Sequence, residues 1–450
     1  MLPIVETEIE LFELITEIED HRIFVAPILK DPFLHYQVNS ISLLYLYDLT
    51  TDKECIVSFN HSEALSIDES LLTKLLCASK ECFVLNLKYI LSKVTCTHMY
   101  DANLVIYFST NKPIDLEEYN TPVHEYFNQK YSNLKDLNHL IPIVKQHEKF
   151  GDIIKEYKEL FKSFNIDEAF IKYNTAIKTL NKIEVNGLYV NSDILKETFP
   201  NVTITNDFVY SEYNPYTTTG RPSNRFDSVN YAALNKESGV RKSFKSRFGN
   251  DGFLLQFDYD AYHIRLLGEL LNYDFPGKIN MHEYFGRQYF GKDILTPEEY
   301  DQSKGITFKL LYGGIEKEFL EIPFFKLVDD FTKTNWKLYR DQRYLETPIY
   351  KRTLKNTFFS EMNSQKLLNY LIQSLEMEET LAILDTLTSF NEGYKSKMIL
   401  YTYDSITIDF HKDDGGKYIK KCQDILECNG KYPVKVQAGY DYQLLKNVTL

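Results

Sequence analysis

The chain has 450 residues, of which 44% are hydrophobic and 14% aromatic, so it can bury the cores of two or three domains. This composition excludes an intrinsically disordered chain. The net charge of −13 excludes a surface that is basic throughout. It does not exclude nucleic-acid binding, because phosphates respond to a local basic groove.

The six cysteines form no CxxC pair and have no histidine cluster at zinc spacing. They are expected to be reduced thiols of a cytoplasmic protein, in the host cytoplasm if the protein is viral. The acidic N-terminus lacks the basic segment of a signal peptide. No apolar run reaches the roughly 20 residues that cross a bilayer, so no membrane partner is expected.

The N-terminal region alternates between strand-like and helical patterns. Residues 22–29 and 40–49 are apolar and rich in β-branched and aromatic side chains, which is typical of strands. Residues 70–79 have helical spacing, and residues 82–87 and 101–108 fit either strands or buried helices. This alternation predicts an α/β unit.

A mostly helical region follows and ends in a turn-rich stretch. Residues 152–164 place their apolar side chains on one stripe, and residues 169–187 keep a helical period up to Gly187. The polar stretch 211–228 then predicts turns. Domain boundaries are expected near 115–150 and near 210.

Two apolar strands of the C-terminal half each carry an aspartate. Residues 253–260 reach Asp258 and continue as a helix, and residues 398–410 carry Asp404 at a turn. An acid in an apolar strand is costly to bury unless it is paired or binds a cation. Two such acids suit two-metal phosphoryl transfer with Mg²⁺. On these strands alone, a capping role for each aspartate is the alternative.

Residues 300–314 predict a helix with one basic and aromatic face. Lys304, Phe308 and Tyr312 follow one another at intervals of four residues, so they share that face. Such a face can hold a triphosphate and stack on a base. The alternative is a core stripe with a snorkelling lysine. Farther on, residues 415–427 predict a helix and residues 432–445 a strand.

The order of these segments resembles that of the family A DNA polymerases, the bacterial DNA polymerase I type. KGITFKLLYGG resembles motif B, and FDYDAYHIRLLGEL and LYTYDSITIDF resemble motifs A and C around the two aspartates. TGRPSN (219–224) and NYLIQS (369–374) resemble two further motifs, and IEVNGLYVN (183–191) resembles the stretch before the thumb. The resemblance covers residues 183–450.

The resemblance implies a template-directed DNA polymerase whose partners are primer–template DNA and dNTPs. Asp258 and Asp404 would bind two Mg²⁺ ions, for which Mn²⁺ can substitute, and Lys304 would act at the triphosphate. The other nucleotide-binding residues implied are Phe308, Tyr312, His263, His282 and Tyr259. The DNA-binding residues implied are Arg221, Asn230, Arg241, Arg265, Asn369 and Gln373.

Two departures from the motifs concern charge. Tyr300 stands where motif B has an arginine, so Arg287 or Lys292 are candidates to supply that phosphate contact. Ser405 replaces the third carboxylate of motif C. Activity is expected to survive, because Asp404 is the main ligand.

A third departure concerns the sugar of the incoming nucleotide. His263 replaces the motif A glutamate that bars the ribose 2′-hydroxyl. A histidine is bulky enough to keep that barrier, and it could hydrogen-bond to Tyr312.

The resemblance implies an α+β fold, in which a right-hand polymerase of palm, fingers and reduced thumb follows an RNase H-like α/β exonuclease-like domain. Residues 1–145 would form the exonuclease-like domain and residues 146–215 a reduced helical thumb or connector. Residues 216–450 would form the palm, with the fingers inserted at about 275–345.

Two losses are expected from the same comparison, and both suit a compact, phage-like enzyme. Ala26, Pro27 and Ile90 stand where the exonuclease carries catalytic acids, which predicts no proofreading. Val190 and Thr219 are only about 30 residues apart, too few for a thumb that reaches across the duplex. Low processivity is therefore expected unless a processivity factor clamps the DNA.

Three alternatives remain from the sequence. A single-subunit RNA polymerase shares the palm and motif B, but its motif A differs. A catalytically inactive polymerase-like binding or scaffold protein would explain Tyr300 and Ser405. A reverse transcriptase fits less well, because motif C lacks paired aspartates.

Overall fold

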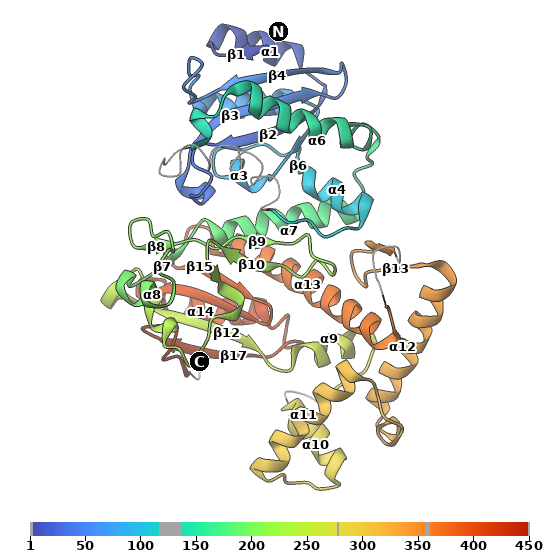
Figure 1. Cartoon of the computed structure of the whole chain (residues 1–450). Coiled ribbons are helices and arrows are strands. Elements are labelled where there is room, and N and C mark those ends of the chain that lie inside the picture. Colours follow the sequence, from blue (N-terminus) through green and yellow to red (C-terminus); the bar gives the residue numbers. More distant parts are fainter. Residues whose placement is uncertain (1–2, 117–136, 277–278, 356–360, 449–450) are drawn as a thin grey trace. The chain divides into compact units, whose positions relative to one another are not determined.

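The computed structural model of the chain describes residues 3–116, 137–276, 279–355 and 361–448. Its internal contacts separate into two compact units (Figure 1). The N-terminal unit comprises Met1–Val185 with Phe226–Ser228, and the C-terminal unit comprises Asn186–Arg225 with Val229–Leu450.

A mixed six-stranded sheet forms the centre of the N-terminal unit, in the order β1-β4-β3-β2-β5-β6. β2 pairs antiparallel with β3 and parallel with β5. Every residue of β3 is buried, which explains its continuous apolar sequence. The strands are β1 (Ile4–Val5), β2 (Arg22–Leu29), β3 (Ile41–Asp48), β4 (Lys53–Ser58), β5 (Glu81–Val84) and β6 (Met99–Asp101).

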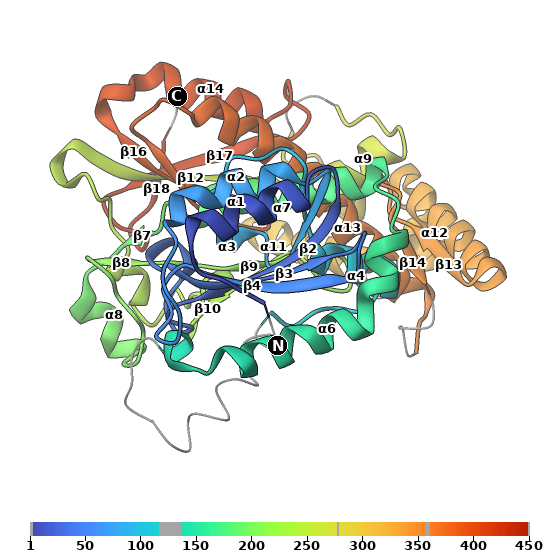
Figure 2. The same ribbon diagram turned by 90° about the horizontal axis from the view of Figure 1, so that it is seen from above.

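Helices cover both faces of this sheet (Figure 2). On one face, Val25 shares an apolar core with Leu11 of α1 and Leu75 of α2. On the other face, the Phe24 ring lies 5.1 Å from the Phe161 ring of α6. The helices are α1 (Glu8–Glu17), α2 (Leu72–Ala78), α3 (Lys88–Leu91), α4 (Ala102–Thr110), α6 (Ile143–Ser163) and α7 (Glu168–Glu184).

The predicted strands at 22–29 and 40–49 and the predicted helix at 70–79 are confirmed. The ambiguous segment 101–108 is the buried helix α4, because Asp101 caps its N-terminus by accepting a hydrogen bond from the Leu104 N–H. The helix predicted up to Gly187 ends at Glu184. Most of the expected boundary region near 115–150 lies outside the described residues.

The compact N-terminal unit extends to Val185, and the exonuclease-like domain predicted for residues 1–145 lies within it. The physical reason is the packing of α6 and α7, which were expected in a thumb or connector. Phe150 of α6 stacks on Tyr45 of β3, and Asn174 of α7 accepts a hydrogen bond from the Asp101 N–H. Both helices therefore belong to the N-terminal unit.

An antiparallel five-stranded sheet, β15-β16-β12-β17-β18, organises the C-terminal unit. β12 lies in its centre, between β16 and β17. The sequence segment 398–410 is a hairpin of two strands and not one strand. The strands are β12 (Gly252–Tyr259), β15 (Lys397–Thr402), β16 (Ser405–His411), β17 (Val434–Gly439) and β18 (Lys446–Asn447).

The helices of this unit fall into two groups. α10, α11 and α12 share an apolar core around Phe285, Leu310 and Phe324, and α10 lies beside α11 (Figure 1). The first group is α10 (Met281–Phe290), α11 (Pro297–Gly313) and α12 (Pro323–Gln342). The other helices are α8 (Ser192–Thr198), α9 (Tyr262–Leu270), α13 (Ser364–Asn391) and α14 (Gly415–Leu426).

Short strands pair locally in the rest of this region. The turn-rich stretch after residue 210 contains a three-stranded sheet in the order β11-β10-β9. These strands are β7 (Leu188–Tyr189), β8 (Phe208–Val209), β9 (Tyr213–Asn214), β10 (Ser223–Phe226), β11 (Val229–Asn230), β13 (Tyr344–Glu346) and β14 (Thr353–Lys355). All six cysteines are unpaired. Within the described ranges, no helix is long and apolar enough to cross a membrane.

Candidate active site

Asp258 and Asp404 lie side by side at one end of the C-terminal sheet. Asp258 is opposite Ser405 in the pairing of β12 with β16, and the Tyr259 N–H donates a hydrogen bond of 2.9 Å to the Asp404 carbonyl. Asp404 occupies the turn between β15 and β16. Strand pairing thus joins two carboxylates that are 146 positions apart in the sequence numbering.

The electrostatics of this pair favour an added positive charge. Burial and the neighbouring Asp404 raise the pKa of Asp258 to about 6, although Lys435 opposes the shift. Burial, followed by the charge of Glu376, raises the pKa of Asp404. Each ionised carboxylate therefore costs free energy that a bound cation would offset.

The donor set fits Mg²⁺. Mg²⁺ is commonly held by one or two carboxylates, with water and substrate phosphates as its remaining ligands. Across the described parts of the chain, no group of three His, Cys, Asp or Glu side chains is placed to hold a metal ion. The Asp258 and Asp404 carboxylates are of the type and number that such a Mg²⁺ site uses.

Strained backbone positions flank both aspartates. Ala261, just before α9, has φ +52°, and Tyr403, just before Asp404, has φ +62°. Non-glycine residues rarely adopt this left-handed conformation, and such residues cluster at functional sites. Ser405, where a third carboxylate was expected from the resemblance, accepts a hydrogen bond of 3.0 Å from the Gln256 side chain.

The predicted face of α11 is solvent-accessible. Phe308 is 51% exposed, and its ring stacks on the Tyr312 ring with centroids 6.0 Å apart. The Lys304 ammonium lies 4.5 Å from the centre of the Tyr300 ring. The core-facing residues of α11 are instead Ser303, Thr307, Leu310 and Leu311. Phe308 of the predicted stripe is therefore exposed, whereas Tyr312 is half-buried and packs against the apolar core.

A buried charged cluster connects this face to the carboxylates. His263 Nδ1 is hydrogen-bonded to the Tyr312 hydroxyl, as the sequence suggested, and His263 Nε2 lies 3.2 Å from Glu376 Oε2. Arg221 Nε lies 2.7 Å from the same oxygen. The Arg221 guanidinium also lies over the Tyr403 ring, 3.6 Å from its centre.

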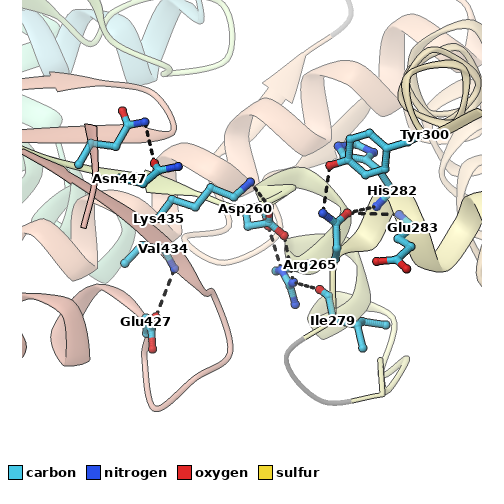
Figure 3. A network of polar contacts seen from close by, with 12 residues as sticks. Asp260, Arg265, Ile279, His282, Glu283, Tyr300, Glu427, Val434, Lys435 and Asn447 are labelled. Atoms are coloured by element: carbon cyan, nitrogen blue, oxygen red, sulfur yellow. Dashed lines mark hydrogen bonds and ion pairs between the residues drawn. The ribbon is translucent and has the colours of Figure 1, made fainter. Parts of the chain in front are cut away.

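Lys435 provides positive charge beside Asp258. It is opposite Asp258 in the pairing of β12 with β17, and its Nζ lies 2.6 Å from Asp260 Oδ1. Figure 3 shows the Lys435 and Arg265 side chains both directed at Asp260. The Tyr300 hydroxyl accepts a hydrogen bond of 3.0 Å from Asn280.

Several predicted site residues lie in other surroundings. Tyr259 is buried, and its hydroxyl donates to the Leu426 carbonyl. Arg265 is also buried and donates to the carbonyls of Asp260 and Ile279. Both side chains are occupied by these contacts and do not face the open side of α11.

The remaining predicted contacts divide between α13 and the flanking loops. Gln373 accepts a hydrogen bond of 3.3 Å from Thr219, which links it to the segment of Arg221, and Asn369 lies one turn earlier on α13. Arg241 donates to the Leu234 carbonyl, and Asn230 ends β11. These four residues are not part of the cluster around Glu376.

The candidates for the missing motif B arginine are engaged elsewhere on the surface. Arg287 pairs with Glu283, and Lys292 pairs with Glu299. His282 stacks near Phe308, with ring centroids 6.1 Å apart, and burial lowers its pKa. Of these residues, only His282 adjoins the exposed face of α11.

Sequence reasoning missed two residues of the site. Glu376 lies three residues after Gln373, so helical spacing could have placed it on the same face of α13. Lys435 gave no comparable signal, because its place beside Asp258 depends on the register of two distant strands.

Comparison with known proteins shows the fold of the chain. No family model matches the sequence, and no curated protein matches it. Among solved structures, the chain is similar to the POL domain of Pol1 from M. smegmatis in complex with DNA primer-template and dNTP. The TM-score is 0.68 and the identity 13%, with 98% of this chain and 100% of that chain covered. The chain therefore has the fold of a DNA polymerase domain.

Proposed function

We propose that the chain is a template-directed DNA polymerase of the family A type that adds dNTPs to a primer 3′-hydroxyl and releases pyrophosphate. The observation that carries this proposal is the carboxylate pair, which adjoins the exposed face of α11 through His263 and Tyr312. The likeness to the M. smegmatis POL domain supports it further.

Asp258 and Asp404 would hold Mg²⁺, or Mn²⁺ in its place. When bound, two such ions stabilise the attacking and leaving oxygens of an in-line displacement. Lys304 and His282 would bind the triphosphate, and Phe308 would stack on the base. These side chains would orient the α-phosphate toward the primer, so the protein contributes position and charge more than covalent chemistry.

Lys435 would supply the positive charge that motif B lacks at Tyr300. Its Nζ is within reach of Asp260, which follows Asp258 by two residues, and its side chain is 57% exposed. Exposure leaves it able to move from the carboxylate of Asp260 to a phosphate. Arg287 and Lys292 form similarly exposed ion pairs, but Lys435 is the one of the three that lies opposite Asp258 in the sheet.

Template and primer contacts would come mainly from Arg221, Asn369 and Gln373, because these residues adjoin the same face of α13. Asn230 and Arg241 would contact the DNA farther from the carboxylates. Arg265 would act indirectly by holding Asp260, and Tyr259 would act through its backbone.

Residues 1–145 would be an RNase H-like exonuclease-like domain without proofreading activity. The mixed order of its sheet supports this proposal. Ala26, Pro27 and Ile90 are buried and offer no oxygen ligand where catalytic acids would stand. The reduced thumb or connector would lie in 146–215, although α6 and α7 of this segment pack within the N-terminal unit. With a palm from residue 216 that carries fingers at about 275–345, such an enzyme would be compact, cytoplasmic and phage-like.

Primer extension tests the main proposal. Wild type with Mg²⁺ and dNTPs should extend a primer, and Asp404→Ala should not, because one of two metal ligands is removed. Asp424→Ala, an exposed carboxylate on α14, is the matched control and should extend as wild type does. Equal extension by wild type and Asp404→Ala would refute the proposal. Ribonucleotide incorporation in place of deoxyribonucleotides would indicate an RNA polymerase.

The second candidate is a catalytically inactive DNA-binding or scaffold protein. The observations that favour it are Tyr300 and Ser405, which replace a phosphate contact and a carboxylate. Binding of primer–template by a wild-type chain that extends no primer would support this candidate over the polymerase.

A further inference from the structure

Glu376 holds a buried negative charge whose partners come from two other segments. Its side chain is 0% exposed. The Arg221 guanidinium approaches both carboxylate oxygens, with Nε 2.7 Å from Oε2 and Nη2 3.1 Å from Oε1. His263 Nε2 lies 3.2 Å from Oε2. The Glu376 carboxylate is thus occupied by ion pairs with Arg221 and His263.

The His263 ring lies between Glu376 and Tyr312 and contacts both. The Nε2 atom of this ring faces the Glu376 carboxylate, 3.2 Å from Oε2. The other ring nitrogen, Nδ1, is hydrogen-bonded to the Tyr312 hydroxyl. The position of that hydroxyl therefore depends on a ring whose orientation Glu376 fixes.

The charge state of Glu376 agrees with this arrangement. Burial alone would raise the pKa of the Glu376 carboxyl, but His263 and Arg221 outweigh that effect and lower it below its ordinary value. A buried carboxylate that stays ionised orients its donors more strongly than a neutral acid would.

We propose that Glu376 is a positioning residue that determines sugar specificity. It holds His263 and Tyr312 against the sugar of the incoming nucleotide, so that the site selects 2′-deoxyribonucleoside triphosphates. This inference rests on the proposed polymerase function. In this chain the carboxylate that the resemblance places at position 263 is supplied instead from α13.

The test measures kcat/KM for a dNTP and for the matching rNTP in single-nucleotide primer extension. Glu376→Gln keeps the size of the side chain but removes its charge. The dNTP-to-rNTP ratio should fall roughly 10- to 100-fold, the range that loss of a charged hydrogen bond corresponds to. An unchanged ratio in an active Glu376→Gln protein overturns the inference.

Glu378→Gln is the matched structural control. Glu378 lies on the same helix, is also 0% exposed, and accepts hydrogen bonds from the Ile349 and Tyr350 N–H groups. Its replacement should leave the dNTP-to-rNTP ratio unchanged. An equal fall of the ratio in both variants would indicate a general structural effect and overturn the inference.

A rescue variant covers the case in which Glu376→Gln does not fold. His263→Glu combined with Glu376→Gln moves the carboxylate to position 263, where it can accept a hydrogen bond from the Tyr312 hydroxyl. This double variant should regain a ratio within about threefold of wild type, since the hydrogen bond is restored. A double variant that folds and extends primers without selectivity overturns the inference.

Failure of the inference and failure of the proposed function are distinguishable. If wild type extends no primer, the proposed function fails and the inference fails with it. If wild type extends primers and Asp404→Ala does not, the function stands, and the ratios of the Glu376 variants decide the inference alone.

Discussion

Replacing Asp258 by asparagine is expected to stabilise the protein at neutral pH when EDTA removes divalent ions. Burial and the nearby Asp404 raise the pKa of Asp258 from 3.8 to about 6 in the folded protein. A carboxyl group with a raised folded-state pKa opposes folding wherever it is ionised. This cost is absent below the ordinary pKa of 3.8, grows as the pH rises, and is complete above about 6.

The size of the effect follows from the same values. A tenfold change in proton affinity corresponds to about 1.4 kcal/mol, so the full cost is roughly 3 kcal/mol. Asp258 is partly exposed, and solvent screening reduces the expected gain to about 1–2 kcal/mol at about pH 7.5. Asp258→Asn should show almost no gain near pH 4.

Urea unfolding measures this gain through the fluorescence of Trp336, the single tryptophan, which lies on α12 in the C-terminal unit. Wild type and Asp258→Asn are compared in EDTA across the pH range. Added Mg²⁺ should stabilise wild type and leave Asp258→Asn nearly unchanged, because ligands stabilise the state that binds them. A gain that is independent of pH, or a loss of stability at pH 7.5, would refute the electrostatic reasoning.

Three further outcomes are expected. Burial lowers the pKa of Lys149 from 10.5 to about 8, so the cost of burying its charge is complete below about pH 8 and decreases as the pH rises to 10.5. Lys149→Met should therefore add about 1–2 kcal/mol near pH 7 and little above pH 10.5, as measured by urea unfolding. Lys435→Met should raise the KM for dNTP about tenfold with a smaller change in kcat, as expected for loss of one charged contact. The control Lys420→Met, on the exposed face of α14, should change neither constant. Equal KM values for wild type and Lys435→Met would contradict the assignment. Wild type with Mg²⁺ should leave a mismatched primer untrimmed in single-turnover conditions. Ile90→Asp alone should not restore trimming, because Ala26 and Pro27 also lack carboxylates. Rapid 3′ trimming by wild type would show that the exonuclease is active.

Local sequence pattern predicted the elements of this chain better than their contacts. The β2 and β3 strands and the α2 helix follow from residue type and periodicity, which act over a few neighbours. Residues 101–108 stayed ambiguous, because a fully buried helix and a fully buried strand are both apolar throughout. In the folded chain, the Asp101 cap and the buried surroundings of α4 separate these two cases.

The site shows the same limit. The aspartates were identified because each interrupts an apolar strand, and the spacing of residues on α11 identified Lys304, Phe308 and Tyr312. The contact between His263 and Tyr312 was anticipated from their places in two motifs. Lys435 could not be anticipated, since a shift of one residue in strand register would have moved its side chain to the other face of the sheet.

Two charged side chains near the aspartates, Lys435 and Glu376, lie outside the motifs that the sequence resembles. Compared with the motifs that the sequence resembles, positions 300, 263 and 405 lack one positive and two negative side chains. Lys435 lies opposite Asp258 on β17, and Glu376 lies beside Arg221 on α13. Because a buried charge is stable only with its partner, moving one member of a pair requires a compensating change nearby. Under the proposed function, Tyr300 and His263 are therefore best tested together with Lys435 and Glu376, because these side chains would act in one site.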